Sequence, residues 1–193
     1  MQTVCVFCGS NTGRGERYAA AARALGHAVA RRGIALVYGG GSIGLMGVLA
    51  EAALAAGVRV TGVAPRRLLE REVVHGGLTE LHVVGSMHER KAKMAELSDA
   101  FVALPGGYGT LDELFEALTW TQLGFQSKPC GLLNVDGYFD RLADYLDHAA
   151  AERFLMREHR DMLLVENDPD LLIERLDSIR LPQVSKWTGP GET

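Results

Sequence analysis

The feature that most constrains the fold is a repeated unit: a short apolar run, then glycine or proline, then a longer segment with helical spacing. Parallel strands buried on both faces read as continuous runs of Val, Leu and Ile, and a helix usually connects each to the next. The pattern predicts strands over residues 3–8, 34–38, 58–63, 80–84, 99–104, 130–134 and 162–165. It predicts helices over residues 16–32, 44–56, 87–97, 111–123, 138–152 and 169–178. We therefore expect an α/β fold, with one doubly wound parallel sheet and helices on both faces.

The 193 residues contain no internal repeat and no linker that would divide them, so we expect a single domain over residues 1–180. Its last helix has a clear start signal, with Asp168 as the cap and Pro169 in the first turn. The segment "LPQVSKWTGPGET", residues 181–193, predicts a flexible C-terminal tail.

Charge and hydropathy exclude several classes of function. The formal net charge is -4 and arginines are scattered among acids, which does not suit binding to a nucleic acid polymer. No apolar run approaches the roughly 20 residues that a membrane span requires. The chain starts directly in a predicted strand without a basic leader, so we expect a cytoplasmic protein with no membrane partner.

The three cysteines and six histidines predict neither a disulfide framework nor a metal site. Cys5 and Cys8 form a CxxC pattern, but residues three apart in a strand point to opposite faces, so the two thiols could share a metal ion only if the strand ended between them. Buried strand thiols are the favoured interpretation. The histidines are dispersed without ligand spacing, so we expect no metal and no cofactor.

Three glycine-rich segments follow predicted strands and should meet at one edge of the sheet. They read "CGSNTG", "YGGGSIGLMG" and "PGGYGT", and a predicted helix follows each. Backbone N–H groups and the positive end of a helix dipole make such an edge suitable for a phosphate. The GxGxxG pattern at Gly39, Gly41 and Gly44 is weak evidence by itself. Arg66 and Arg67 stand where an NAD site would carry an acid, which disfavours NAD and leaves NADP open.

The segment "SMHERKAKMAEL" predicts a helix with Met87 and Met94 on one face and with Arg90 and Lys91 on or beside that face. A cation directed toward the interior needs an anionic partner, because an unpaired buried charge is costly. The alternative is that the cations reach out to solvent along the methionine stripe, which we favour for Lys93.

Glu113 follows the third glycine segment and has two interpretations. Thr110 and Glu113 have the spacing of a capping box, in which the glutamate only reaches back to a backbone N–H. Alternatively, a carboxylate in the first helical turn and near an arginine is held ionised. Such a group suits a base, a nucleophile or a stabiliser of positive charge that develops beside a bound phosphate.

The motifs "GGGSIGLMG", "MHERKAKM" and "PGGYGTLDE", in this order and spacing, resemble the Lonely Guy (LOG) family of cytokinin riboside 5'-monophosphate phosphoribohydrolases over about residues 3–178. The resemblance implies a Rossmann-like fold, a homodimer and a nucleoside monophosphate as the small-molecule partner. It implies hydrolysis of the N-glycosidic bond of N6-substituted AMP, which gives the free N6-modified adenine and ribose 5-phosphate.

The resemblance also assigns site residues. Arg90 and Glu113 match the catalytic pair of the family. The positions that match its substrate-binding residues are Gly39, Gly40, Glu72, Met87, Lys91, Gly106, Gly107, Gly109, Thr110 and Thr119. For Glu72 and Thr119, a surface or helix-packing role is the alternative. The proton donor to the leaving adenine is open among Asp112, Glu116 and His88.

Of four alternative functions, two stay open and two are disfavoured. A broader nucleosidase would act on AMP or other 5'-monophosphates, because nothing in the sequence encodes a pocket for the N6 substituent. A non-catalytic carrier of a nucleotide or of molybdenum cofactor would need only the phosphate cradle. An NADP-dependent oxidoreductase is disfavoured because no hydride-transfer set stands out. A lysine decarboxylase is disfavoured because no lysine has the context of a Schiff base.

Overall fold

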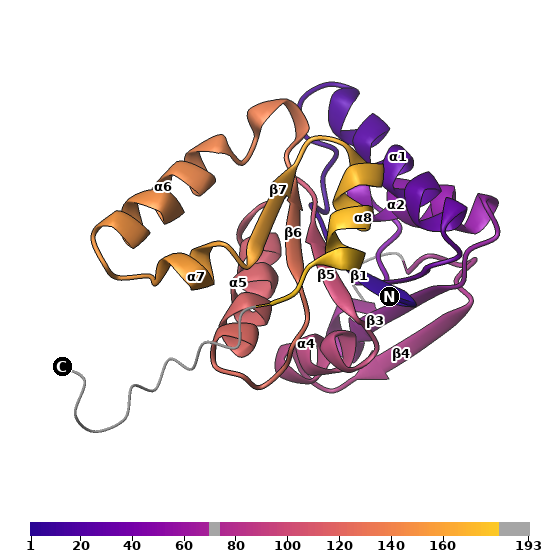
Figure 1. Cartoon of the computed structure of the whole chain (residues 1–193). Helices are drawn as coiled ribbons and strands as arrows, with labels where there is room; N and C mark the ends of the chain where they lie inside the picture. Colours follow the sequence, from indigo (N-terminus) through magenta and orange to yellow (C-terminus); the bar gives the residue numbers. More distant parts are fainter. Residues whose placement is uncertain (70–73, 182–193) are drawn as a thin grey trace.

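The computed structural model describes residues 1–69 and 74–181, and in this part of the chain seven strands form one parallel sheet (Figure 1). The strands are β1 (Thr3–Phe7), β2 (Ala35–Tyr38), β3 (Val60–Pro65), β4 (Glu80–Val84), β5 (Ala100–Ala103), β6 (Cys130–Leu133) and β7 (Leu163–Glu166). Their order is β4-β3-β2-β1-β5-β6-β7, and every neighbouring pair is parallel. The order reverses between β1 and β5, and a ligand crevice is expected at such a switch point.

The helices lie on both faces of the sheet, as the sequence predicted (Figure 1). They are α1 (Arg17–Arg31), α2 (Gly44–Ala55), α3 (Arg66–Leu69), α4 (Met87–Glu96), α5 (Tyr108–Gln122), α6 (Asp140–Ala151), α7 (Arg157–Arg160), α8 (Pro169–Ser178) and the 3-10 turn η1 (Val135–Gly137). Each predicted strand and helix has an observed counterpart. The sequence pattern missed α3, η1 and α7, because elements of three or four residues are too short to show a period.

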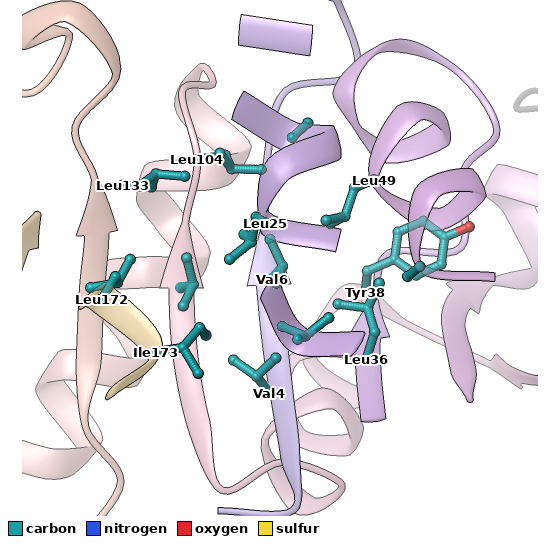
Figure 2. Close-up of a cluster of buried hydrophobic side chains, with 14 of the residues drawn as sticks. Val4, Val6, Leu25, Leu36, Tyr38, Leu49, Leu104, Leu133, Leu172 and Ile173 are labelled. Carbon is teal, nitrogen blue, oxygen red and sulfur yellow. The ribbon is translucent and has the colours of Figure 1, made fainter. Parts of the chain in front are cut away.

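Alternation along the strands divides the core into two layers. Val4 and Val6 of β1 point to the face covered by α1, α2 and α8, where they join a buried cluster (Figure 2). Cys5 and Phe7 point to the opposite face and pack with residues of α4 and α5. β1 ends at Phe7, between the two cysteines, so Cys8 is a half-buried residue beyond the strand and not the buried strand thiol that was predicted. It nevertheless packs against the first cluster, on the face opposite to Cys5.

Two predicted helix starts had different outcomes. Asp168 caps α8, because its Oδ1 accepts a hydrogen bond of 2.9 Å from the N–H of Leu171. The capping box at Thr110 and Glu113 is wrong, since α5 begins at Tyr108 with Gly107 as its cap residue and no side-chain cap. Glu113 is therefore in the second turn of α5, not the first, and a capping role does not explain it.

Three further findings bear on the sequence predictions. The described helices include none that is long and apolar enough to cross a bilayer. All three cysteines are free. Within residues 1–69 and 74–181, no group of three or more potential ligands could hold a metal ion. The predicted tail beyond residue 181 lies outside the described residues, and the domain boundary at residue 180 stays a prediction.

Candidate active site

A cavity of about 480 Å³ lies at the carboxyl ends of the strands, beside the switch point between β1 and β5. The three glycine segments meet there, as predicted. The N–H of Gly9 donates to the carbonyl of Pro105 at 3.1 Å, and the N–H of Leu45 donates to the carbonyl of Gly9 at 3.0 Å. The loop after β1 thus touches both the loop after β5 and the start of α2.

Close approach explains two of the glycines in this wall. Gly44 has a φ of +61°, and a Cβ there would lie under 3.0 Å from the backbone of Ser10. A Cβ at Gly106 would lie under 3.0 Å from Oγ1 of Thr110 and from the N–H nitrogen of Gly9. These glycines let three loops pack backbone to backbone, which places backbone amide groups in this part of the cavity wall.

The start of α5 forms the wall best suited to a phosphate. Gly106, Gly107, Tyr108, Gly109 and Thr110 all line the cavity. The first N–H groups of a helix have no partner within the helix, and the dipole there favours an anion. The predicted phosphate segment is therefore at the cavity, with its amides in the first turn of a helix.

Arg90 and Glu113 form a buried ion pair in the cavity wall. Nη1 of Arg90 lies 3.0 Å from Oε1 of Glu113, and the side chains are 10% and 9% exposed. Nε of Arg90 also donates to the carbonyl of Val63 in β3 at 3.0 Å. Nη2 lies where a Cβ of Gly39 would stand, so only glycine leaves room for this guanidinium at the end of β2. Three elements therefore hold Arg90 in one orientation.

Burial changes the expected electrostatics of Glu113. Desolvation raises the pKa of Glu113 above its ordinary value, and the opposing effect of Arg90 does not fully offset it. The expectation that helix dipole and arginine would together favour ionisation is wrong in direction, because Glu113 lies in the second turn and is buried. A carboxylate with a raised pKa is a stronger base once it is ionised.

The structure brings together seven of the twelve site residues that the resemblance assigned. Those lining the cavity are Gly39, Arg90, Gly106, Gly107, Gly109, Thr110 and Glu113. Gly40 lies next to it in a left-handed turn, where its carbonyl accepts from the N–H of His75. Met87 is 43% exposed and is not part of the wall. Met94 is buried with Arg90 on the inner face of α4 and does not line the cavity either. Glu72 lies outside the described residues.

Lys91 and Thr119 face other parts of the molecule. Nζ of Lys91 lies 3.1 Å from Asp112 and 3.0 Å from Glu116, both on α5. Thr119 donates its hydroxyl to the carbonyl of Phe115 and lines a separate small pocket of about 90 Å³ between α5, α6, α7 and β7.

Two tyrosines that sequence reasoning missed also line the cavity. The rings of Tyr18 and Tyr138 meet edge to face with centroids 5.8 Å apart. The hydroxyl of Tyr138 donates to the carbonyl of Gly106 at 2.6 Å, which fixes the peptide before α5. A signal was available for Tyr138, because "NVDGYF" follows a predicted strand at the same edge of the sheet.

The fold and the cavity define the class: a Rossmann-like α/β protein with a ligand site at the switch point of its sheet. The fold is shared with the molybdenum cofactor binding protein of Rippkaea orientalis, with a TM-score of 0.70 over 92% of this chain and 96% of that one. The two sequences are 24% identical, so this likeness concerns the fold alone.

Sequence comparison identifies the family. A family model described as "Possible lysine decarboxylase" matches residues 46–176. The cytokinin riboside 5'-monophosphate phosphoribohydrolase of Rhodococcoides fascians is 52% identical over 168 residues, which are 86% of this chain and 85% of that protein. An Arabidopsis thaliana enzyme of the same name is 47% identical over 174 residues, 90% of this chain and 81% of the relative. The chain belongs to this family of phosphoribohydrolases, the LOG family.

Proposed function

We propose that the protein hydrolyses the N-glycosidic bond of cytokinin riboside 5'-monophosphates, N6-substituted forms of AMP, to the free N6-modified adenine and ribose 5-phosphate. The printed names of the relatives that are about half identical over most of the chain support this activity. The observation in the structure that carries it is the buried pair of Arg90 and Glu113, in the same cavity wall as the amide-rich start of α5.

The geometry supports separate roles for the start of α5, for Glu113 and for Arg90. The amides at the start of α5 bind the 5'-phosphate, which positions the ribose near Glu113. Cleavage gives the ribose oxocarbenium character, and a carboxylate beside it stabilises that charge or takes a proton from the attacking water. Arg90 cannot give up its proton, so it holds Glu113 in place and favours its ionised form.

The bonds balance as a simple hydrolysis. The oxygen of water bonds to the anomeric carbon, and the water proton goes to Glu113. The carbon–nitrogen bond breaks, and the base leaves with the electron pair and takes up a proton from solvent. Glu113 then returns the water proton to solvent, so the enzyme is regenerated. Of the candidate donors, Asp112 and Glu116 are engaged with Lys91, and His88 is exposed on α4; none of the three lines the cavity.

The test is release of free base from isopentenyl-AMP and from AMP by the wild type, by Glu113→Gln and by a control variant. Glu96→Gln is the matched control, because Glu96 pairs with Lys93 on the outer surface of α4. We expect the wild type and Glu96→Gln to release base, with isopentenyl-AMP preferred. Glu113→Gln should lose at least about a hundredfold in kcat, while its melting temperature falls only modestly and the variant stays folded at the assay temperature.

The outcomes separate the alternatives. Equal rates on both substrates would favour the broader nucleosidase. Binding of nucleotide without release of base by the wild type would refute the hydrolase and favour a carrier. An active Glu113→Gln enzyme would remove the carboxylate from the mechanism.

We also propose a cytoplasmic homodimer. The exposed apolar side chains Phe125, Tyr145 and Phe154 on and beside α5 and α6 support association with a second copy, and the free thiols suit a reducing compartment. Light scattering after gel filtration measures the mass in solution and so tests whether the protein is a dimer. A monomeric wild type at micromolar concentration would contradict it.

A further inference from the structure

Lys91 is next to Arg90 in the sequence but makes a different set of contacts. Its side chain is 11% exposed, and its Nζ is held between Oδ2 of Asp112 at 3.1 Å and Oε2 of Glu116 at 3.0 Å. Asp112 and Glu116 lie one residue before and three residues after Glu113 on α5. Lys91 therefore forms ion pairs with both sides of the turn of α5 that carries Glu113.

The ion pairs of Lys91 lie on the side of Glu113 that faces away from the cavity. Glu113 lines the cavity, and it also lines a small void of about 10 Å³ between α4, α5 and the sheet. Lys91 and Glu116 line that void and are not part of the cavity wall. To reach a phosphate in the cavity, the ammonium group would have to leave both carboxylates.

The surroundings of Lys91 keep its ammonium group charged. Burial alone would lower the pKa of Lys91, but hydrogen bonds to Glu116 and Asp112 raise it above its ordinary value. The lysine thus stays charged at every pH at which the protein would work, and it satisfies two acids that flank Glu113. The ion pair of Arg90 and Glu113 fixes one side of α5 to α4, and the contacts of Lys91 fix the other.

We propose that Lys91 is a positioning residue, which clamps Asp112 and Glu116 so that the carboxylate of Glu113 is held against Arg90 and toward the cavity. The proposal rests on the hydrolase function proposed above. It replaces the substrate-binding role that the family resemblance assigns to Lys91, because the structure turns this side chain away from the ligand cavity.

The charges around Glu113 give the clamp a second effect. Arg90 and Lys91 approach from α4, Asp112 and Glu116 flank Glu113 on α5, and the thiols of Cys5 and Cys8 lie on the β1 side. The two cations lower the pKa of Glu113, whereas Asp112 and Glu116 raise it. Loss of Lys91 should therefore raise this pKa and move the acid limb of the activity profile to higher pH.

The experiment compares Lys91→Met, Lys91→Arg and a control on the same helix. Lys93→Met is the control, because Lys93 pairs with Glu96 and is not among the charges around Glu113. Rates with isopentenyl-AMP are measured from acid to neutral pH, with thermal melts alongside. We expect Lys91→Met to lose about ten- to a hundredfold in kcat, with KM within about threefold and the acid limb at higher pH. Lys91→Arg should recover most of the rate, and Lys93→Met should match the wild type.

A ligand role makes the opposite prediction. If Lys91→Met raises KM strongly while kcat and the acid limb stay unchanged, Lys91 binds substrate and the proposal is overturned. If Lys91→Met does not fold, Glu116→Gln decides the question. This variant loosens the clamp but removes a negative charge, so kcat should fall while the acid limb moves to lower pH. An unchanged kcat in Glu116→Gln would refute the clamp.

A readout without turnover separates this proposal from the proposed function. Carboxyl carbon NMR can follow the titration of Glu113 in the wild type and in Lys91→Met, with Glu113→Gln used to assign the signal. A higher pKa of Glu113 in Lys91→Met supports the clamp even if the wild type releases no base. An unchanged pKa overturns the proposal even if the hydrolase activity is confirmed.

Discussion

The substitution Gly39→Ala tests the geometry of the catalytic pair without touching either member. A Cβ at Gly39 would lie under 3.0 Å from Nη2 of Arg90 and 3.3 Å from its Cζ. Gly39 does not have a positive φ, so the alanine backbone is unstrained, and the main conflict is with the guanidinium, beside a tight 3.3 Å contact with the Sδ of Met46. The guanidinium is held by Val63 and Glu113, so it can yield only by giving up these contacts.

The magnitude follows from the distances. Carbon and nitrogen atoms pack at roughly 3.5 Å, so the guanidinium must retreat by about 1 Å or more. That shift lengthens the 3.0 Å contact with Glu113 beyond hydrogen-bond range. A misplacement of about 1 Å can cost a hundredfold in rate, which is about 2.7 kcal/mol of transition-state stabilisation. The cost in folding stability should be about 1–2 kcal/mol, because Glu113 can take up a proton when its partner leaves.

The assay is base release from isopentenyl-AMP, together with urea denaturation. Gly76→Ala is the matched control, because a Cβ there meets no atom within 4 Å and Gly76 has no positive φ. We expect Gly39→Ala to lose about a hundredfold in kcat/KM and Gly76→Ala to match the wild type. A Gly39→Ala enzyme within threefold of the wild type would show that the placement of Arg90 against Gly39 does not matter for catalysis.

Three further predictions concern stability. Glu113→Ala leaves the buried guanidinium of Arg90 without its partner, so urea denaturation should show a loss of about 3–5 kcal/mol in the free energy of unfolding. Glu113→Gln keeps an acceptor and should lose clearly less. Equal losses in the two variants would contradict this account of the pair. Gly44→Ala should cost at least about 2 kcal/mol by the same measurement, because it combines a left-handed φ with a clash against Ser10, and a neutral result would contradict the close approach of the loops. Partial desolvation opposes the charge of Asp99, but hydrogen bonds from two backbone N–H groups at the start of β1 lower its pKa. Because Asp99 is exposed and solvent screens it, Asp99→Ala should cost less than about 1 kcal/mol at pH 7. The lowered pKa stabilises the folded state above the ordinary value of 3.8, so this difference should shrink as the pH falls below it; a constant difference would refute the linkage.

The fold was predictable because its signals are local. Apolar runs, glycine turns and helical spacing act within about ten residues, and each predicted strand and helix has a counterpart in the parallel sheet and its helices. The start of α5 was not predictable from pattern. Thr110 and Glu113 have capping-box spacing, yet Thr110 is buried against Gly106 and the helix starts at Tyr108.

The site also combines features that the sequence predicts with features that it does not. The meeting of the three glycine segments follows from their position after parallel strands, whose carboxyl ends share one edge. The raised pKa of Glu113 does not, because it comes from atoms that other segments place around the carboxylate. The aromatic contact of Tyr18 with Tyr138 joins residues that are distant in the sequence, and no local pattern predicts that they meet.

The amino-acid sequence by itself determined the parallel sheet, the glycine-rich edge and the presence of two cations and three acids near it. Tertiary structure decided which of them meet in the cavity. Neighbouring residues on a helix point about 100° apart, so the rotation of α4 determines whether Arg90 or Lys91 faces inward. Met94 is buried on the inner face of α4 four residues after Arg90, and this packing turns Arg90 to Glu113 and Lys91 to Asp112 and Glu116.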